Sequence, residues 1–269
     1  CHGSTDAPAV SVWETGVGAG QLFNNFVYSD FEGYLELPTN DYVVEVRDDA
    51  GTTTVASYDA PLATLGLQGA SAVVVASGFL NPANNSGGAG FGLWVALPSG
   101  GNLIPLPTST AKIQVIHNSA DAAASTVDVY LNGGLAIDNF AFRTATPFID
   151  VPAGVQISVA IAPSTSTSVA DAIATFNYNL ASGEKYVIVA NGIVSPSGYN
   201  PSIPFDLHVY AGGRESATVS TNTDLLVCHG STDAPAVSVW ETGVGAGQLF
   251  NNFVYSDFEG YLELPTNDY

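Results

Sequence analysis

The sequence has few cationic side chains, no methionine and only two cysteines. Five Lys and Arg residues face 25 Asp and Glu residues, which gives a formal net charge of −20 at pH 7. This charge repels phosphate backbones and anionic lipid headgroups, so we expect no nucleic acid among the partners. The apolar runs are also shorter than the roughly 18–20 residues that a membrane span needs, and we expect no membrane insertion.

The two ends of the chain have the same sequence. Residues 1–42 return letter for letter as residues 228–269, a shift of 227 residues. Because exposed positions diverge first, this identity indicates a recent duplication or one repeating polymer. The second copy begins inside an apolar run, DLLVCHG, which predicts a strand. We therefore expect the 269 residues to be one 227-residue period plus an overlap, taken from a longer array.

Each period contains a single thiol, because Cys1 and Cys228 are the same position of the repeat. A disulfide within one period is therefore excluded. The strand context favours a buried free cysteine. A bridge between neighbouring units is the alternative that the sequence leaves open.

A second, older repeat divides the period in two. The halves align at a constant offset of 114 residues over the segments 23–38 and 137–152, 73–82 and 187–196, and 91–95 and 205–209. Ser- and Thr-rich joints at 105–111 and 215–224 separate the halves. The predicted domains are module one at 1–110 with a truncated first strand, module two at 111–222, and the start of the next module one at 223–269.

The fold class is predicted to be all-β. The runs YLELP, YVVEV, FIDVP and VDVYL alternate apolar and polar residues, which is typical of strands with one buried face. Asn132-Gly133 predicts a hairpin with a type I′ turn. Abundant glycine and the absence of helical spacing fit this assignment. We expect tandem β-sandwich modules, Ig-like or transthyretin-like, of about 113 residues each and two per period.

Three motifs follow one another along the chain. Their positions are Val227, His2 or His229, Ser4, Asp6, Ala7, Pro8, Val10 and Val12, then Asn25, Phe26, Tyr34, Leu37 and Pro38, then residues 73–80. With these motifs the chain resembles the secreted prokaryotic modules of the domain-of-unknown-function 4397 family, which implies a bacterial or archaeal extracellular β-sandwich, often in tandem, and no activity. Module two departs from the pattern, with Ala122 or Ala123 in place of Pro8 and Phe148 in place of Tyr34.

Catalysis is not predicted. His2, Ser4 and Asp6 include the residue types of a hydrolase triad, but no Gly-x-Ser-x-Gly elbow is present. The same three residue types recur at the front of module two, which favours a structural role closing a turn after the first strand. We therefore expect no catalytic residue, no enzyme and no organic cofactor.

Calcium is the candidate metal. Asp30, Glu32, Asp48 and Asp49 offer carboxylates of the kind that weak extracellular calcium sites use. A solvated acidic face is the alternative interpretation. Module two has threonine at the counterparts of Asp30 and Glu32, so any such site is confined to module one or to a joint.

Two further features are candidate surface sites. Asn84-Asn85-Ser86 is an N-glycosylation sequon in a Gly-rich loop, so Asn84 is a candidate modification site. Trp13, Trp94, Tyr28 and Tyr34 are candidates for a sugar-binding face. Because Trp94 lies in the alternating run FGLWV, packing in the core or at a module interface is favoured.

The favoured hypothesis is a structural subunit of an extracellular or cell-surface filament or adhesin stalk, whose partners are copies of itself. The units would be linked covalently or by strand complementation. The alternative is a multivalent accessory module that binds carbohydrate or a cell surface. The predicted polymer joint consists of Asp224, Leu225, Leu226, Val227 and Cys228.

Overall fold

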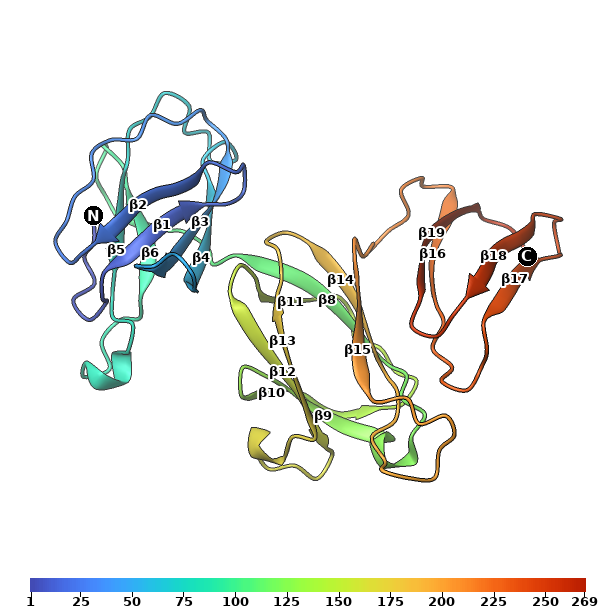
Figure 1. Ribbon diagram of the computed structural model, residues 1–269. Coiled ribbons are helices and arrows are strands. Elements are labelled where there is room, and N and C mark those ends of the chain that lie inside the picture. The colour runs from blue at the N-terminus through green and yellow to red at the C-terminus, as the bar shows by residue number, and fades with distance from the viewer. The chain divides into compact units, whose positions relative to one another are not determined.

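The computed structural model describes residues 1–269 as an all-β protein with 19 strands and three short 3-10 helices (Figure 1). No helix is long and apolar enough to span a membrane. The chain forms two compact units, and the three-part division expected from the repeat stays a prediction. Unit 1 comprises Cys1–Ala111, Pro152–Gln156 and Asn179–Gly183, and unit 2 comprises Lys112–Val151, Ile157–Tyr178 and Glu184–Tyr269.

Unit 1 contains a four-stranded sheet in the order β2-β1-β3-β4 and a three-stranded sheet in the order β5-β6-β7. One cluster of buried side chains joins them, since Val10 and Val46 from the first sheet pack with Leu93 from β6. This is the layering of a β-sandwich. The strands are β1 (Val10–Glu14), β2 (Gly20–Phe26), β3 (Asp41–Asp48), β4 (Thr54–Pro61), β5 (Val73–Ser77), β6 (Gly92–Ala96) and β7 (Ile104–Pro105), with helix η1 at Pro82–Asn84.

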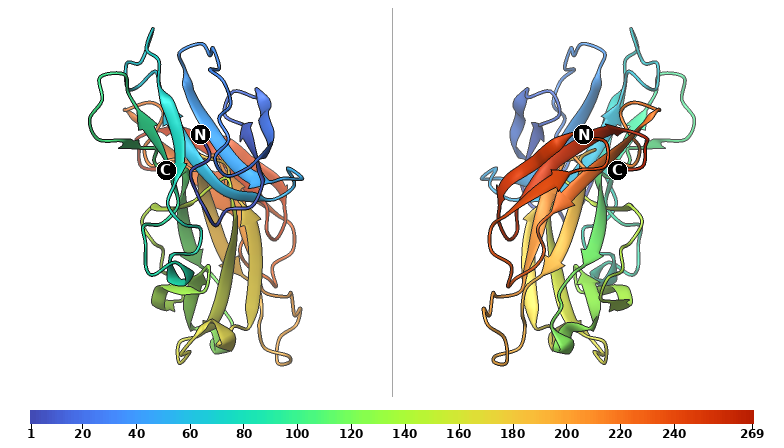
Figure 2. Two further views of the ribbon diagram at one scale, coloured as in Figure 1. Left: turned by 90° about the vertical axis from the view of Figure 1, so that its left-hand side faces the viewer. Right: turned by 90° about the vertical axis from the view of Figure 1, so that its right-hand side faces the viewer.

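Unit 2 contains two four-stranded sheets, in the orders β10-β9-β12-β13 and β11-β8-β14-β15 (Figures 1 and 2). Val129 and Ile161 from the first sheet line the same apolar interior as Val115 and Ile188 from the second, again as in a sandwich. The strands are β8 (Thr110–His117), β9 (Thr126–Leu131), β10 (Gly134–Ala141), β11 (Ile149–Pro152), β12 (Gln156–Pro163), β13 (Ala174–Asn179), β14 (Lys185–Asn191) and β15 (Asp206–Ala211), with helices η2 (Ala122–Ala124) and η3 (Val169–Asp171).

The hairpin predicted at Asn132-Gly133 is confirmed. Strands β9 and β10 pair antiparallel on either side of it. Asn132 has a φ of 50° and Gly133 a φ of 82°, as a type I′ turn requires at its two central positions. The strands predicted from YVVEV, FIDVP and VDVYL are also present, as β3, β11 and β9.

Unit 2 also contains the second copy of the repeated segment. It forms two antiparallel pairs, β16 with β19 and β17 with β18. The strand expected at DLLVCHG is therefore confirmed as β16. The bounds are β16 (Asn222–Cys228), β17 (Val237–Glu241), β18 (Gly247–Phe253) and β19 (Phe258–Pro265).

The strand predicted for YLELP is present in only one of its two copies. Residues 261–265 lie in β19, whereas residues 34–38 have no strand structure, so the prediction is wrong for the first copy. The physical reason is whether a partner strand lies beside the segment. β19 is hydrogen-bonded to β16, whereas residues 34–38 pair with no strand of the structure. A strand is stable only where its backbone groups are paired.

The same absence distinguishes the second sheets of the two units. At the offset of 114 residues, β5 and β6 correspond to β14 and β15. Unit 2 continues past β14 with β8 and β11, whereas β5 is the last strand of its sheet in unit 1. The sheet of unit 1 therefore has an open edge at β5.

Candidate functional site

The predicted joint residues lie on strand β16. This strand pairs antiparallel with β19, in a register that places Thr223 opposite Leu264 and Leu225 opposite Leu262. Leu225 is 45% exposed, whereas Ile113, its counterpart on β8, is 6% exposed. Ile113 is covered because it lies in the apolar interior between the two sheets of unit 2, whereas β16 belongs to a two-stranded sheet and has a partner on one side only. β16 therefore has an unpaired edge and an apolar side chain with no core to cover it.

An aromatic and cationic cluster anchors the β16–β19 pair beside β15. The ring of Tyr210 lies 5.6 Å from that of Phe258 and 6.0 Å from that of Tyr261. The Arg214 guanidinium lies 4.6 Å from the Tyr261 ring centroid, within range of a cation–π interaction. The backbone N–H of Arg214 also donates to the Tyr261 hydroxyl at 2.8 Å.

Arg214 additionally binds two carboxylates of the β16–β19 pair. Its Nη1 lies 2.6 Å from Oδ2 of Asp224 and 2.8 Å from Oε1 of Glu263. Burial raises the pKa of Asp224, but the hydrogen bond from the Thr218 backbone and the Arg214 guanidinium lower it more, so this pKa is below its usual value. The segment between β15 and β16 is therefore pinned at Arg214, rather than being a free linker.

The His-x-Ser-x-Asp motif has a structural role. In unit 2, Ser119 donates to the carbonyl of Gly192 at 2.6 Å, and the buried ring of His117 contacts the carbonyl of Ala124 at 2.7 Å. The Nε2 atom of His117 and the hydroxyl of Ser119 are therefore occupied by backbone groups, while Nδ1 of His117 is buried without a hydrogen-bond partner. In unit 1, Ser4 donates to the carbonyl of Gly78 in the same way.

The aspartate of this motif binds a distant loop. Asp121 accepts hydrogen bonds from the backbone of Val194 and Ser195 and from the Tyr199 hydroxyl. Burial alone would raise the pKa of Asp121, but these hydrogen bonds lower it to about 2. The local turn predicted at this residue is present, because Asp121 caps η2 by accepting from the backbone N–H of Ala123 at 2.9 Å. In addition, Asp121 holds the loop after β14, and Asp6 holds the loop after β5 through Leu80 and Asn81.

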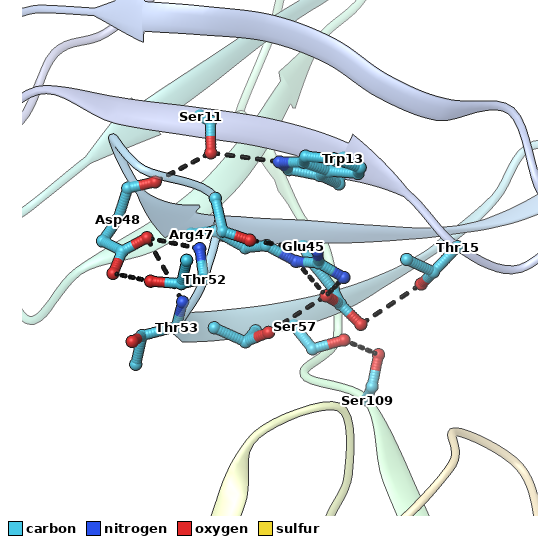
Figure 3. A network of polar contacts seen from close by, with 12 residues as sticks. Ser11, Trp13, Thr15, Glu45, Arg47, Asp48, Thr52, Thr53, Ser57 and Ser109 are labelled. Atoms are coloured by element: carbon cyan, nitrogen blue, oxygen red, sulfur yellow. Dashed lines mark hydrogen bonds and ion pairs between the residues drawn. The ribbon is translucent and has the colours of Figure 1, made fainter.

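The polar network of unit 1 fixes Trp13 (Figure 3). Arg47 lies over the Trp13 ring, 4.5 Å from its centroid, and bonds the largely buried carboxylate of Glu45 at 2.7 Å. The indole N–H donates to Ser11 at 3.0 Å. Trp13 is thus a packed residue under a guanidinium, and Trp94 lies on β6.

Three of the four candidate calcium ligands accept hydrogen bonds from separate backbone groups. Asp30 accepts from the N–H of Val27, Asp49 from that of Asn25, and Asp48 from those of Thr52 and Thr53. No group of three or more His, Cys, Asp or Glu side chains is arranged to hold a metal ion. Calcium at Asp30, Glu32, Asp48 and Asp49 stays a prediction.

Asn84 and the two cysteines have the following settings. Asn84 is exposed at the end of η1, where a glycan would meet no packed neighbour.

Cys1 and Cys228 are free thiols, each half-buried. Burial and the Asp257 carboxylate raise the pKa of Cys228 to about 11, which disfavours the reactive thiolate.

Sequence reasoning missed Tyr210, Arg214 and Tyr261 as joint residues. One signal could have found Arg214, because it is one of only five cations in a chain with 25 carboxylates. Tyr261 is the second copy of Tyr34, a motif position. Its contact with Arg214, however, joins residues that are 47 positions apart in the sequence, so no local pattern indicates it.

Comparison with known proteins gives one family match. Residues 111–240 match the model described as "Domain of unknown function (DUF4397)". No curated protein matches the chain. A crystal structure from Bacteroides uniformis, described as "a putative cell adhesion protein", covers 77% of this chain and 91% of its own at 11% identity and a TM-score of 0.18, a likeness too small to define the fold. The motif-based expectation is confirmed: over residues 111–240 this chain resembles the DUF4397 family.

Proposed function

We propose that the protein is a structural subunit of an extracellular filament or cell-surface stalk of a bacterium or archaeon, built from tandem β-sandwich modules with two modules per 227-residue period. Its partners would be copies of itself. The units would be joined covalently through strand β16, or by β16 completing the sheet of the next subunit. The proposal includes no enzymatic activity.

The observation that carries the proposal is the anchored joint in unit 2. The chain passes from β15 into β16, the strand that opens the next copy of the repeat, and Arg214 ties this passage to both β16 and β19. A flexible tether would let successive modules move independently. A joint held by an Arg–carboxylate pair and stacked aromatic rings instead favours a defined, repeating geometry, as a filament needs.

The polar side chains support a structural role. The His, Ser and Asp residues of the repeated motif bond to backbone groups of their own unit, as described above for Ser119 and Asp121. Trp13 is stacked under Arg47, so we do not extend the proposal to sugar binding at this residue. The acidic composition would favour solubility of an exposed polymer.

Electron microscopy of the native secreted material tests the proposal. We expect fibres or rows of beads with a regular repeat. The intact mass of the denatured material would separate the two kinds of linkage, because a covalent array gives a multiple of the mass of one period and strand complementation gives one period. Dispersed particles of single-chain size under both measurements would contradict the proposed function.

A further inference from the structure

The open edge of β5 in unit 1 has the features of an acceptor for a strand. Val74 and Ala76 direct their backbone groups away from β6, since the Val74 carbonyl accepts from the amino group of Cys1 at 2.8 Å and the Ala76 N–H donates to the Cys1 carbonyl at 2.9 Å. Val73 and Val74 are 38% and 44% exposed.

The segment on the far side of this edge is also unpaired. Phe31 is 74% exposed, Tyr34 is 78% exposed and Leu37 is 42% exposed, although all three are large apolar or aromatic side chains. The counterpart of Leu37 in unit 2 is Val151, which is 2% exposed on β11. In unit 2 the strand β8 lies between β11 and β14. In unit 1 the corresponding place between residues 31–38 and β5 contains no strand.

We propose that this place in unit 1 receives strand β16 from a second copy of the chain, which adds parallel to β5 and antiparallel to residues 31–38. The inference rests on the proposed self-association and identifies its acceptor. Strand addition to an open sheet edge is an established mode of peptide recognition.

The register of both pairings can be taken from the chain itself. β8 pairs parallel with β14, with Ile113 opposite Tyr186 and Val115 opposite Ile188. Applied to unit 1, this register places Leu225 opposite Ala72 and Val227 opposite Val74. It also places His2 opposite Ala76, and this pair is observed as a parallel bridge.

The donor strand already binds the acceptor sequence. Residues 31–38 are identical to residues 258–265, which form β19 and pair with β16. When β16 exchanges its own β19 for residues 31–38 of another copy, it keeps the same cross-strand partners. Phe31 and Tyr34 then take the places of Phe258 and Tyr261 beside Tyr210 and Arg214 of the donor.

The exchange adds interactions that neither copy has alone. β16 gains hydrogen bonds along β5, and Leu225 gains the cover that Ile113 has in unit 2. The donor strand leaves the acceptor at Cys228, where the acceptor's own Cys1 begins. Exchange of an identical element with a gain of contacts is a low-cost route to assembly, and a head-to-tail contact of this kind continues from copy to copy.

The test uses the full chain and a synthetic peptide of residues 217–227, which omits the cysteine. We expect the peptide to slow amide hydrogen exchange by roughly tenfold or more in β5 and in fragments that run from residue 34 past Tyr42. Those fragments are unique to the first copy, because the second copy ends at Tyr269. The matched control is the same peptide with Leu225→Asp and Val227→Asp, which places charges on the buried face and should give no protection.

Sedimentation of the full chain, with Tyr34→Ser as the variant, gives the second measurement. Tyr34 is exposed in the free chain, so the substitution should leave the fold intact and weaken self-association. Equal protection by both peptides, or none by either, overturns the inference, and polymers seen in that case would show that the proposed function stands with a different joint. Protection by the native peptide alone in a chain that stays monomeric would support the acceptor and contradict the filament.

Discussion

Residues 31–38 and residues 258–265 share the sequence FEGYLELP but differ in structure. The second copy is strand β19, paired with β16 and packed on Tyr210. The first copy has no strand structure, and the side chains of Phe31 and Tyr34 are mostly exposed. Because the local sequence is the same, the difference comes from the neighbouring strand. The apolar alternation of this segment is thus conditional on a partner.

The two copies differ in the opposite sense at Trp13 and Trp240. Trp13 lies on β1, which pairs with both β2 and β3, and Arg47 of β3 covers its ring. Trp240 lies on β17, which pairs with β18 alone, and is 61% exposed. Each copy therefore has contacts that the other lacks. A complete module requires the strand before the repeated segment and the strand after it.

The largest effect is expected from supplying the missing strand covalently. A chain extended before Cys1 by the sequence of residues 215–227 should form a strand at 34–38 and cover Leu37. Burial of a leucine side chain stabilises by about 1.5–3 kcal/mol, so the thermal unfolding midpoint of unit 1 should rise by about 10 °C. Calorimetry measures the shift. The same extension carrying Leu225→Asp and Val227→Asp serves as the control, and an equal rise for both would refute this account of the difference.

The second prediction compares Asp121 with Asp233, which occupy the same motif position but bind different groups. Asp121 binds the loop after β14, whereas Asp233, at the same motif position, bonds to Ser231. Asp121→Asn should cost unit 2 about 1.5–2 kcal/mol, because the half-buried backbone N–H groups of the loop lose a charged acceptor. Asp233→Asn should give no measurable change. Urea unfolding of the two variants compares them directly.

The stabilisation by Asp121 depends on pH because its pKa is lowered. Burial raises this pKa, but the hydrogen bonds that the carboxylate accepts lower it to about 2. The folded-state pKa is below the unfolded value near 3.8, so the stabilisation is complete above about pH 4 and is lost as the pH falls toward 2. The native chain should therefore lose stability in this window, while Asp121→Asn should lose less. Parallel acid-unfolding curves for the two proteins would count against the assignment.

The sequence predicted the parts of the fold that depend on local signals. Alternating runs located strands such as β3 and β9, and Asn132-Gly133 located a type I′ hairpin because few residue pairs accept positive φ at both positions. The run before Cys228 was correctly predicted as the strand β16. These signals operate within a few residues, so they survive in any context where a partner strand is available.

The parts that could not be predicted depend on pairing at long range. Nothing within FEGYLELP distinguishes its paired copy from its unpaired copy. The local turn at Asp121 could be predicted, but its further partners Val194 and Ser195 are 73 and 74 residues away and could not. The Arg214 cluster likewise combines residues of β15, β16 and β19. A spacing pattern has no access to such contacts.

A smaller effect is expected from the matched substitutions Tyr261→Ser and Tyr34→Ser. Tyr261 stacks on Tyr210, lies under the Arg214 guanidinium and accepts its backbone N–H, so its loss should cost unit 2 about 1–2 kcal/mol. Tyr34 has none of these contacts in the free chain, and its loss should leave thermal unfolding unchanged. If the two substitutions lower the free energy of unfolding equally, the Arg214 cluster does not anchor the β16–β19 pair.

The smallest effect distinguishes the two tryptophans at a single position of the repeat. In chains that retain only Trp13 or only Trp240, with the other two tryptophans replaced by phenylalanine, iodide should quench Trp240 several-fold more strongly, because Arg47 covers Trp13 while Trp240 is 61% exposed. Arg47→Ala should bring the quenching of Trp13 toward that of Trp240 without altering Trp240 itself. Strong quenching of both rings in the native chain would mean that Arg47 does not cover Trp13, and the difference between the two copies would then be confined to β16 and its partners.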